Sequence, residues 1–448
     1  MIKNKYFLYT TIFFLLSHCS FDNKSGIWAS GKKERERNSE LENNQKKVLD
    51  VIKIYSSSDL FKSEIKLNAP IKLTKAIKNT SWKMSSLNHQ NFLGNLYLPS
   101  IENMFLKKKI GKNKSSISNN KSSPIIFENN IIFSDDKGTI YNITGTGVLN
   151  WKINIYKKIY KKIYKNLSYS IYQNNIYVSD NVGFLYSISL SNGEVNWIKN
   201  HGIPLKSNIK VMDKKIFVIN QDNRLLCFST SDGSKAWDIR SISSFIKSQK
   251  FLSLALSKEG DLISFNSSAD LMKNKGSNGE YYWSLNTSNS MIDATDFFTS
   301  SNIVLDKDNI IFSEGSTFYS FNHLTSQQNW AQTVSTVGSP IIVNQHIFSI
   351  TENGFFAIMK KNTGEIISSN NILKILKKKK RNTKVTGFVM GSGKLYSVTL
   401  NGYLIVSSAT SGIVESFRKI SDSIISPPII NDGKLYIITK NSKILGFN

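Results

Sequence analysis

One pattern recurs along most of the chain, and it limits the fold more tightly than composition does. Its clearest copy is Asn174–Trp197, NNIYVSDNVGFLYSISLSNGEVNW. Two runs rich in β-branched and aromatic residues flank a turn at Asp180–Gly183, and a second turn at Ser191–Gly193 leads to a third run that ends in tryptophan. Turns at fixed offsets between such runs predict antiparallel hairpins. Each turn ends in glycine, which suits a backbone with positive φ.

About eight copies of this pattern follow one another, and repeats of this length with four short strands each are typical of propeller blades. The fourth copy breaks the pattern, and we interpret the break as an insertion before Gly279 and Trp283; the glycine turn of the fifth is degraded. The copies cover residues 123–151, 174–197, 215–237, 254–283, 309–330, 339–366, 394–414 and 426–448.

The first five copies end in tryptophan, and we interpret each of these side chains as a wedge between neighbouring sheets rather than as a ligand contact. They are Trp151, Trp197, Trp237, Trp283 and Trp330.

The last copy supplies three strands before Asn448 and lacks the fourth. Upstream of the first copy, Asn79–Met84 (NTSWKM) resembles a detached fourth strand that carries Trp82. Pairing the two would close a ring and remove an open sheet edge, which would otherwise invite aggregation. We therefore predict an all-β fold, an eight-bladed β-propeller of four-stranded antiparallel blades over residues 74–448, closed by an N-terminal strand.

Residues 1–19 are not expected to belong to the fold. Lys3 and Lys5 precede an apolar run that is too short to span a membrane as a stable helix, and the segment ends Leu-Ser-His-Cys. It resembles a bacterial lipoprotein signal, which implies that Cys19 becomes the acylated first residue. A plain secretory signal or an uncleaved anchor is the alternative. Residues 20–73 are polar and charged, and we predict a flexible tether.

Two basic insertions interrupt the repeats. Residues 155–165, IYKKIYKKIYK, would place an apolar stripe on a helix that lies on a membrane surface, or would form an enlarged loop between the first two blades, which we favour. Residues 371–381, NILKILKKKKR, are expected to form a solvated loop. The formal net charge of +26 favours anionic surroundings such as lipid headgroups. No nucleic-acid motif accompanies the dispersed lysines, so nucleic acid is not an expected partner.

No residues form a recognisable site for chemistry. The five histidines lack metal-site spacing, and the acidic residues fall mainly in turns, as Asp180 and Asp222 do. Cys227 lies in a strand pattern and is expected to be a small buried apolar residue. We therefore predict no catalytic residue, no cofactor and no metal.

The repeat resembles one that occurs in two known groups of proteins. Its sequence of apolar strand, Asp-x-x-Gly turn, apolar strand, Ser/Thr-x-Gly turn and tryptophan is similar to the repeat of pyrroloquinoline-quinone enzymes. The same repeat occurs in the BamB family, lipoproteins of the outer-membrane β-barrel assembly machinery. The lipoprotein-like start and the single propeller favour BamB. A quinoprotein dehydrogenase-like enzyme and a polysaccharide-binding envelope propeller are the alternatives.

Resemblance to BamB implies a non-catalytic scaffold that is lipid-anchored at the outer membrane and faces the periplasm. Its implied partners are the barrel-inserting, BamA-like subunit, nascent outer-membrane proteins and the membrane itself. It also implies that the partner-binding residues lie in 239–250, IRSISSFIKSQK, and 291–297, MIDATDF. The residues so implied are Arg240, Phe245, Ile246, Lys247, Asp293 and Asp296.

Overall fold

The computed structural model describes two compact units, Met1–Asp59 and Leu60–Asn448. In the first, only the paired strands β1 (Ser20–Phe21) and β2 (Trp28–Ala29) are described. In the second, the structure describes residues 64–111, 123–160, 162–241, 252–287, 300–351, 353–377 and 383–448. Every other described strand belongs to this second unit.

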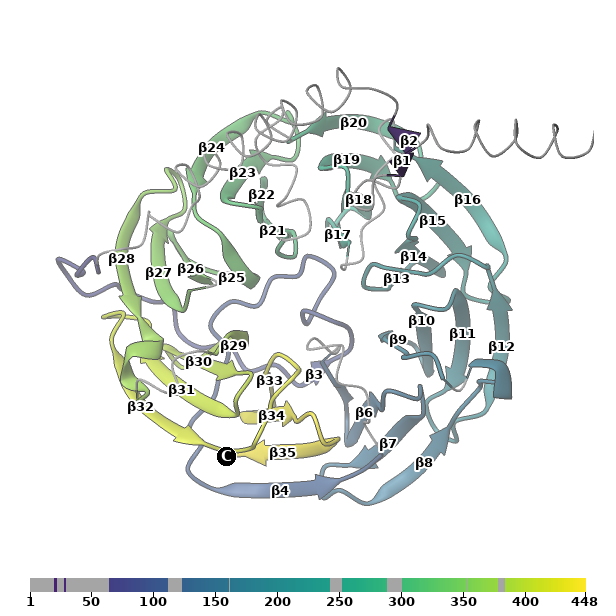
Figure 1. Cartoon of the computed structure of the whole chain (residues 1–448), viewed down its shortest axis with the longest axis horizontal. Coiled ribbons are helices and arrows are strands. Elements are labelled where there is room, and N and C mark those ends of the chain that lie inside the picture. Colours follow the sequence, from purple (N-terminus) through teal and green to yellow (C-terminus); the bar gives the residue numbers. More distant parts are fainter. Residues whose placement is uncertain are drawn as a thin grey trace, which may run out of the picture. The chain divides into compact units, whose positions relative to one another are not determined.

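Eight antiparallel sheets follow one another around a ring, as predicted (Figure 1). Blade 1 contains β5 (Ile125–Phe127), β6 (Asn130–Ser134), β7 (Ile140–Thr144) and β8 (Leu149–Ile153). Blade 2 contains β9 (Leu167–Tyr172), β10 (Asn175–Asp180), β11 (Phe184–Ser189) and β12 (Val195–Asn200). Blade 3 contains β13 (Lys210–Met212), β14 (Lys215–Ile219), β15 (Arg224–Ser229) and β16 (Lys235–Arg240). Blade 4 contains β17 (Ser253–Leu256), β18 (Asp261–Phe265), β19 (Asp270–Lys275) and β20 (Tyr281–Asn286).

The second half of the ring repeats this order. Blade 5 contains β21 (Val304–Asp306), β22 (Asn309–Glu314), β23 (Thr317–Asn322) and β24 (Gln328–Thr333). Blade 6 contains β25 (Thr336–Val343), β26 (His346–Thr351), β27 (Phe355–Lys360) and β28 (Ile366–Asn371). Blade 7 contains β29 (Val385–Gly391), β30 (Lys394–Thr399), β31 (Tyr403–Ser408) and β32 (Val414–Lys419). Blade 8 contains β33 (Ile429–Asn431), β34 (Lys434–Ile438), β35 (Lys443–Phe447) and β4 (Met104–Lys109).

The fourth blade has no insertion, which corrects the reading of the fourth copy. Residues 266–269 form an ordinary turn between β18 and β19. Ala269 adopts φ 61° at the place where blades 1, 2, 6 and 7 have glycine. Because left-handed backbone is rare outside glycine, this alanine concealed the turn in the sequence.

The tryptophan wedges are confirmed. Trp197 lies on the outer strand of blade 2, and its indole N–H donates to the Thr230 carbonyl of blade 3 at 3.0 Å. A Cβ on Gly233, which has φ +70°, would lie 2.4 Å from the Trp197 ring. Trp151, Trp237 and Trp330 contact Gly193, Gly279 and Gly364 of the following blades in the same way. The glycine therefore serves both the turn and the close approach of the neighbouring ring.

Blade 8 receives its outer strand from β4, whereas the sequence had assigned that place to the segment around Trp82. Leu106 of β4 pairs with Gly446 and lies beside a register shift, as each tryptophan does in its own blade. Its side chain is 3% exposed and packs on Gly147 of blade 1. A Cβ added to that glycine would lie 3.0 Å from the Leu106 side chain. Trp82 instead belongs to β3 (Ser81–Trp82), which pairs with β5 at the inner edge of blade 1. The sequence did not predict β4 as the closing strand, because it has leucine where the outer strands of blades 1 to 5 have tryptophan.

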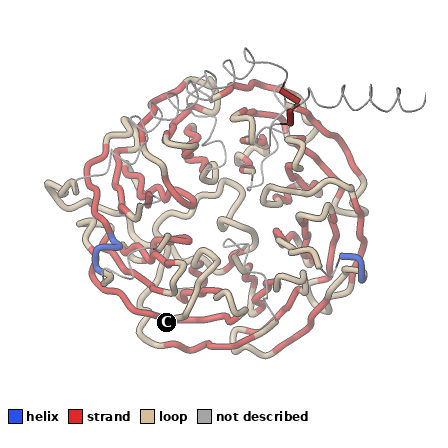
Figure 2. The backbone as a smooth tube through the Cα atoms, viewed as in Figure 1, coloured by secondary structure: helices blue, strands red, loops and turns tan. Residues whose placement is uncertain are grey.

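Residues 77–99, which we call the axial segment, cross the middle of the ring as irregular backbone (Figures 1 and 2). Met84 bridges to β9, and Leu256 of β17 donates its N–H to the His89 carbonyl. Leu305 of β21 donates to the Gln90 carbonyl, and Leu96 bridges to the end of β29. Further contacts with β5 and β33 mean that the chain itself occupies the axis on which the inner strands converge.

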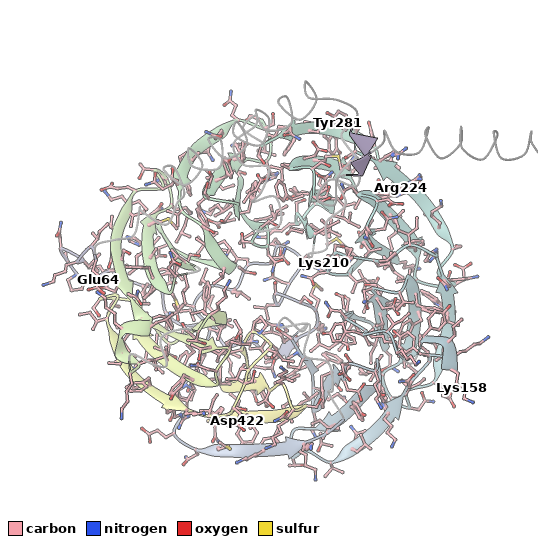
Figure 3. All side chains as sticks on the ribbon, in the orientation of Figure 1. Glu64, Lys158, Lys210, Arg224, Tyr281 and Asp422 are labelled. Atoms are coloured by element: carbon pink, nitrogen blue, oxygen red, sulfur yellow. The ribbon has the colours of Figure 1, made fainter. Side chains whose placement is uncertain are left out.

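A buried cation holds this segment in place. Lys210 of β13 lies near the middle of the ring, is 0% exposed, and donates to Asn91 Oδ1 at 2.6 Å and the Asn88 carbonyl at 2.7 Å (Figure 3). The Asn91 amide in turn donates to the carbonyls of Leu254 and Ile303. Burial lowers the pKa of Lys210 to about 7.

Both basic insertions pack partly into the fold. The first forms a loop between blades 1 and 2 with one 3₁₀ turn, η2 (Lys158–Tyr160), so the loop interpretation is confirmed. The second begins with η3 (Ile372–Ile375), in which Ile372 and Leu373 are buried. The expectation of a solvated loop is therefore wrong for the first half of 371–381, because its apolar side chains enter the core. Residues 378–382 lie outside the described residues.

The closing role of β4 predicts a large effect of Leu106→Ala. Removing this buried side chain should lower the free energy of unfolding by roughly 2–5 kcal/mol, measured by denaturant titration. Leu149→Ala changes an exposed leucine (46%) on the outer strand of blade 1 and should cost less than about 0.5 kcal/mol. Equal stability of the two variants would show that β4 does not close the ring.

The buried Lys210 predicts a pH dependence of stability. An unfolded lysine has a pKa near 10.4. Since burial brings the folded pKa to about 7, the folded state binds fewer protons between these values, and stability should rise with pH across that window. The gain is at most about 1.4 kcal/mol per pH unit. The pKa of nearby His89 is lowered by burial, so this group titrates below the window.

Lys210→Met should abolish this rise, measured as the free energy of unfolding from pH 7 to 9. Lys258→Met, at an exposed lysine, controls for the loss of one positive charge. Parallel pH curves for wild type and Lys210→Met would contradict the assignment.

Candidate functional site

The two faces of the ring differ in what they carry. Because the four strands of a blade alternate in direction, the turn between its second and third strands lies on the same face as the connectors that lead to the next blade. We call this the connector face. The turns between first and second and between third and fourth strands lie on the opposite face. The sequence-implied docking segments fall in two adjacent connectors, residues 241–252 between blades 3 and 4 and residues 287–300 between blades 4 and 5.

Among the implied docking residues, Arg240 is the one that the structure describes. It is the last residue of β16 and pairs with Arg224 of β15. The remaining candidate residues, including the predicted acylation site, lie outside the described residues: Cys19, Phe245, Ile246, Lys247, Asp293 and Asp296. The structure therefore describes the residues at both ends of each connector.

A polar cluster joins blades 3 and 4 beneath these connectors. Asn223, in the middle turn of blade 3, is 1% exposed and accepts from the Ser267 hydroxyl of blade 4 at 2.8 Å. Asn286, at the end of β20, donates to the Ser268 carbonyl at 2.8 Å and to Asp270 Oδ1 at 2.6 Å. Asn223, Ser267 and Asp270 are buried, and buried polar groups that are satisfied in this way specify one arrangement of the turns.

Glu314 extends the cluster to blade 5 and contacts both ends of the second connector. The Thr287 hydroxyl, at the start of that connector, donates to Glu314 Oε2. Ser300, where the connector returns, forms an antiparallel bridge with Glu314. The Thr287 N–H also donates to the Ala269 carbonyl at 2.9 Å. One residue of β22 therefore fixes where this connector leaves the ring and where it re-enters.

The base of the first connector carries clustered charge. Asp238 of β16 accepts from Arg224 at 2.7 Å and from Lys235 at 2.7 Å. The hydrogen bond from Lys235, together with that from Arg224, holds the pKa of Asp238 below its usual value. Arg240 follows two residues later as the last residue of β16, and it pairs with Arg224, so two arginines lie where the connector begins.

Sequence reasoning missed the residues that support these connectors. Asn223, Asp270, Asn286, Thr287 and Glu314 come from three blades, and each looks like an ordinary turn or strand-end residue. Only the alignment of repeats, with equivalent turns placed side by side, could have suggested that they meet.

The described residues contain no arrangement suited to catalysis by a metal. No group of three or more His, Cys, Asp or Glu side chains among them could hold a metal ion. Cys227 is fully buried, as expected, and burial raises the pKa of its thiol to about 12. Within the same part of the chain, no helix has the length and apolar character needed to cross a bilayer.

Comparison with solved structures identifies the fold. BamB from Moraxella catarrhalis is similar with a TM-score of 0.63 and 10% sequence identity, over 77% of this chain and 100% of that one. Quinohemoprotein alcohol dehydrogenase from Comamonas testosteroni is similar with a TM-score of 0.61 and 10% identity, over 83% of this chain and 81% of that one. At such identity the likeness concerns the fold alone, which enzymes and assembly factors share.

Comparison of sequences is more specific. The outer membrane protein assembly factor BamB of Moranella endobia (strain PCIT) is 18% identical over 297 residues, which cover 61% of this chain and 72% of that protein. The profile of the family described as outer membrane protein assembly factor BamB matches residues 136–370, more than half of the chain. The protein is therefore a member of the BamB family, a propeller built from the repeat that this family shares with quinoprotein enzymes.

Proposed function

We propose that the protein is a non-catalytic, lipid-anchored scaffold of the outer-membrane β-barrel assembly machinery. It binds the barrel-inserting, BamA-like subunit and aids the delivery and insertion of nascent outer-membrane proteins from the periplasmic side. The observation that carries this proposal is the family match over residues 136–370, because that region includes both connectors implied in docking.

The geometry beneath the connectors supports a docking role. Binding is weakened by the entropy lost when loops become ordered at an interface. Here Glu314 contacts both ends of the second connector. Asn223 joins blade 3 to the middle turn of blade 4, and residues next to that turn form the rest of the polar cluster. Two neighbouring connectors thus leave the same face from a base that hydrogen bonds join across three blades, so a partner can contact both at once.

The occupied axis weighs against the enzyme alternative. Similarity to a quinohemoprotein alcohol dehydrogenase favours that alternative at the level of the fold. A cofactor enclosed by all the blades would need room where the inner strands converge. The axial segment fills that place and is held there by Lys210 and by backbone hydrogen bonds to several blades.

The docking proposal is tested by paired substitutions in each connector. Phe245→Ala with Lys247→Glu should weaken co-purification with the BamA-like subunit, as should Asp293→Arg with Asp296→Arg, because both pairs lie in the proposed contact. Loss of a central contact residue costs roughly 2 kcal/mol or more, about a 30-fold change in affinity. Lys258→Glu with Asp308→Arg, at exposed residues of the opposite face, should leave the yield unchanged. Wild-type recovery of both connector variants would place docking elsewhere.

The proposed anchor depends on Cys19. Cells that express Cys19→Ser should yield protein without incorporated radiolabelled fatty acid, since the acylated residue is gone. Cys227→Ala is the matched control, because it removes the other of the two cysteines of the chain and should keep the label. Labelling of Cys19→Ser at the wild-type level would refute lipidation at this residue.

A further inference from the structure

The connector between blades 1 and 2, residues 154–166, divides its side chains in an unexpected way. Tyr156 is buried, and its hydroxyl donates to Asp180 Oδ2 at 2.5 Å. The rings of Tyr156 and Tyr160 both meet Phe184 edge to face, at 5.8 and 5.4 Å. Tyr156 and Tyr160, from two of the three Ile-Tyr pairs, therefore face the protein and fix the connector against blade 2.

Two isoleucines and three lysines of the same connector face outward. Ile159 is 78% exposed and Ile163 is 47% exposed. Lys157, Lys158 and Lys162 are exposed around them. Lys137, in the middle turn of blade 1, joins this group, since Asn154 donates to its carbonyl at 3.2 Å. We call these six residues the basic tip.

Nearby carboxylates do not neutralise the basic tip, because they are turned into the protein. Asp135, Asp136 and Asp180 are 2%, 7% and 1% exposed. Asp180 Oδ1 accepts from three backbone N–H groups of its own turn, and Asp135 Oδ1 accepts from two. The buried Lys165, which interacts electrostatically with all three, offsets their charge from within. The basic tip thus combines positive charge with exposed aliphatic groups.

We infer that the basic tip contacts an anionic lipid surface, with its isoleucines at headgroup level and its lysines against the phosphates. Aliphatic residues among lysines are typical of protein surfaces that lie on membranes. Lysine stems cover apolar surface while their charged ends stay in water. The cores of protein interfaces instead favour Tyr, Trp and Arg and are depleted of Lys. Here the tyrosines are turned inward, so lipid suits the exposed side chains better than a protein partner does.

A local probe tests this contact in the full chain. Ile159→Cys, in a Cys19→Ser background, is labelled with a polarity-sensitive fluorophore, and buried Cys227 is not accessible to the reagent. Leu324→Cys, at an exposed position (60%) in a turn of the opposite face, is the matched control. Vesicles contain phosphatidylcholine alone or with phosphatidylglycerol, and nitroxide-bearing lipids report the depth of the probe.

We expect a blue shift and nitroxide quenching at residue 159 with phosphatidylglycerol vesicles only, and neither at residue 324. Each lysine near an anionic surface contributes about a fivefold gain in binding. Lys158→Glu with Lys162→Glu should therefore raise the lipid concentration for half-maximal quenching by at least about 25-fold. Absence of quenching at residue 159, or equal quenching at both probes, would overturn the proposal. So would a spectral change that requires the BamA-like subunit instead of lipid, since that result would assign the tip to a protein partner.

Discussion

The ring depends on one contact that is repeated between neighbouring blades, an outer-strand side chain packed against the glycine turn of the next blade. In Trp197 this contact joins ring packing on Gly233 with a hydrogen bond from the indole N–H to a backbone carbonyl. The interaction fixes the separation and the order of the blades at once. Ser368 and Ser416 replace the tryptophan in blades 6 and 7, and there the N-terminal chain adds contacts of its own. Ile65 pairs with Ser369 of blade 6, Ile71 donates its N–H to Thr410 of blade 7, and β4 completes blade 8. The three blades without an outer-strand tryptophan are thus braced by the segment that precedes the first blade.

Repeat spacing was sufficient to predict the architecture, because turns and tryptophans recur at fixed offsets. It failed where a different residue performs the same task. Leu106 occupies the tryptophan position of the closing strand, and Ala269 adopts the left-handed backbone of a glycine. The axial segment could not be predicted at all, since irregular backbone has no hydrophobic period. Its position depends on hydrogen bonds to carbonyls of distant blades and on Lys210, a residue whose sequence context is that of an ordinary strand.

The candidate docking surface was found in a different way. Family resemblance, not residue pattern, pointed to the connectors at 241–252 and 287–300, and only Arg240 of the implied residues lies in the described part of the chain. What the structure adds is their support, in which Asn223, Asp270 and Glu314 come from three successive blades. Such a cluster depends on the angle between blades, which follows from tertiary packing and leaves no local signal.

Antiparallel blades also explain why these features share one face. The connectors between blades must all lie on the same side of the ring, and their lengths can change without disturbing the tryptophan contacts, which involve the turns of the opposite side. Longer connectors therefore start and end on the connector face, as do the one at residues 154–166 and those that begin at residues 241 and 287. The two proposed contacts, with a BamA-like subunit and with lipid, require surfaces that face the same way. Because chain topology already imposes that arrangement, a scaffold of this kind can acquire the second contact by lengthening one more connector.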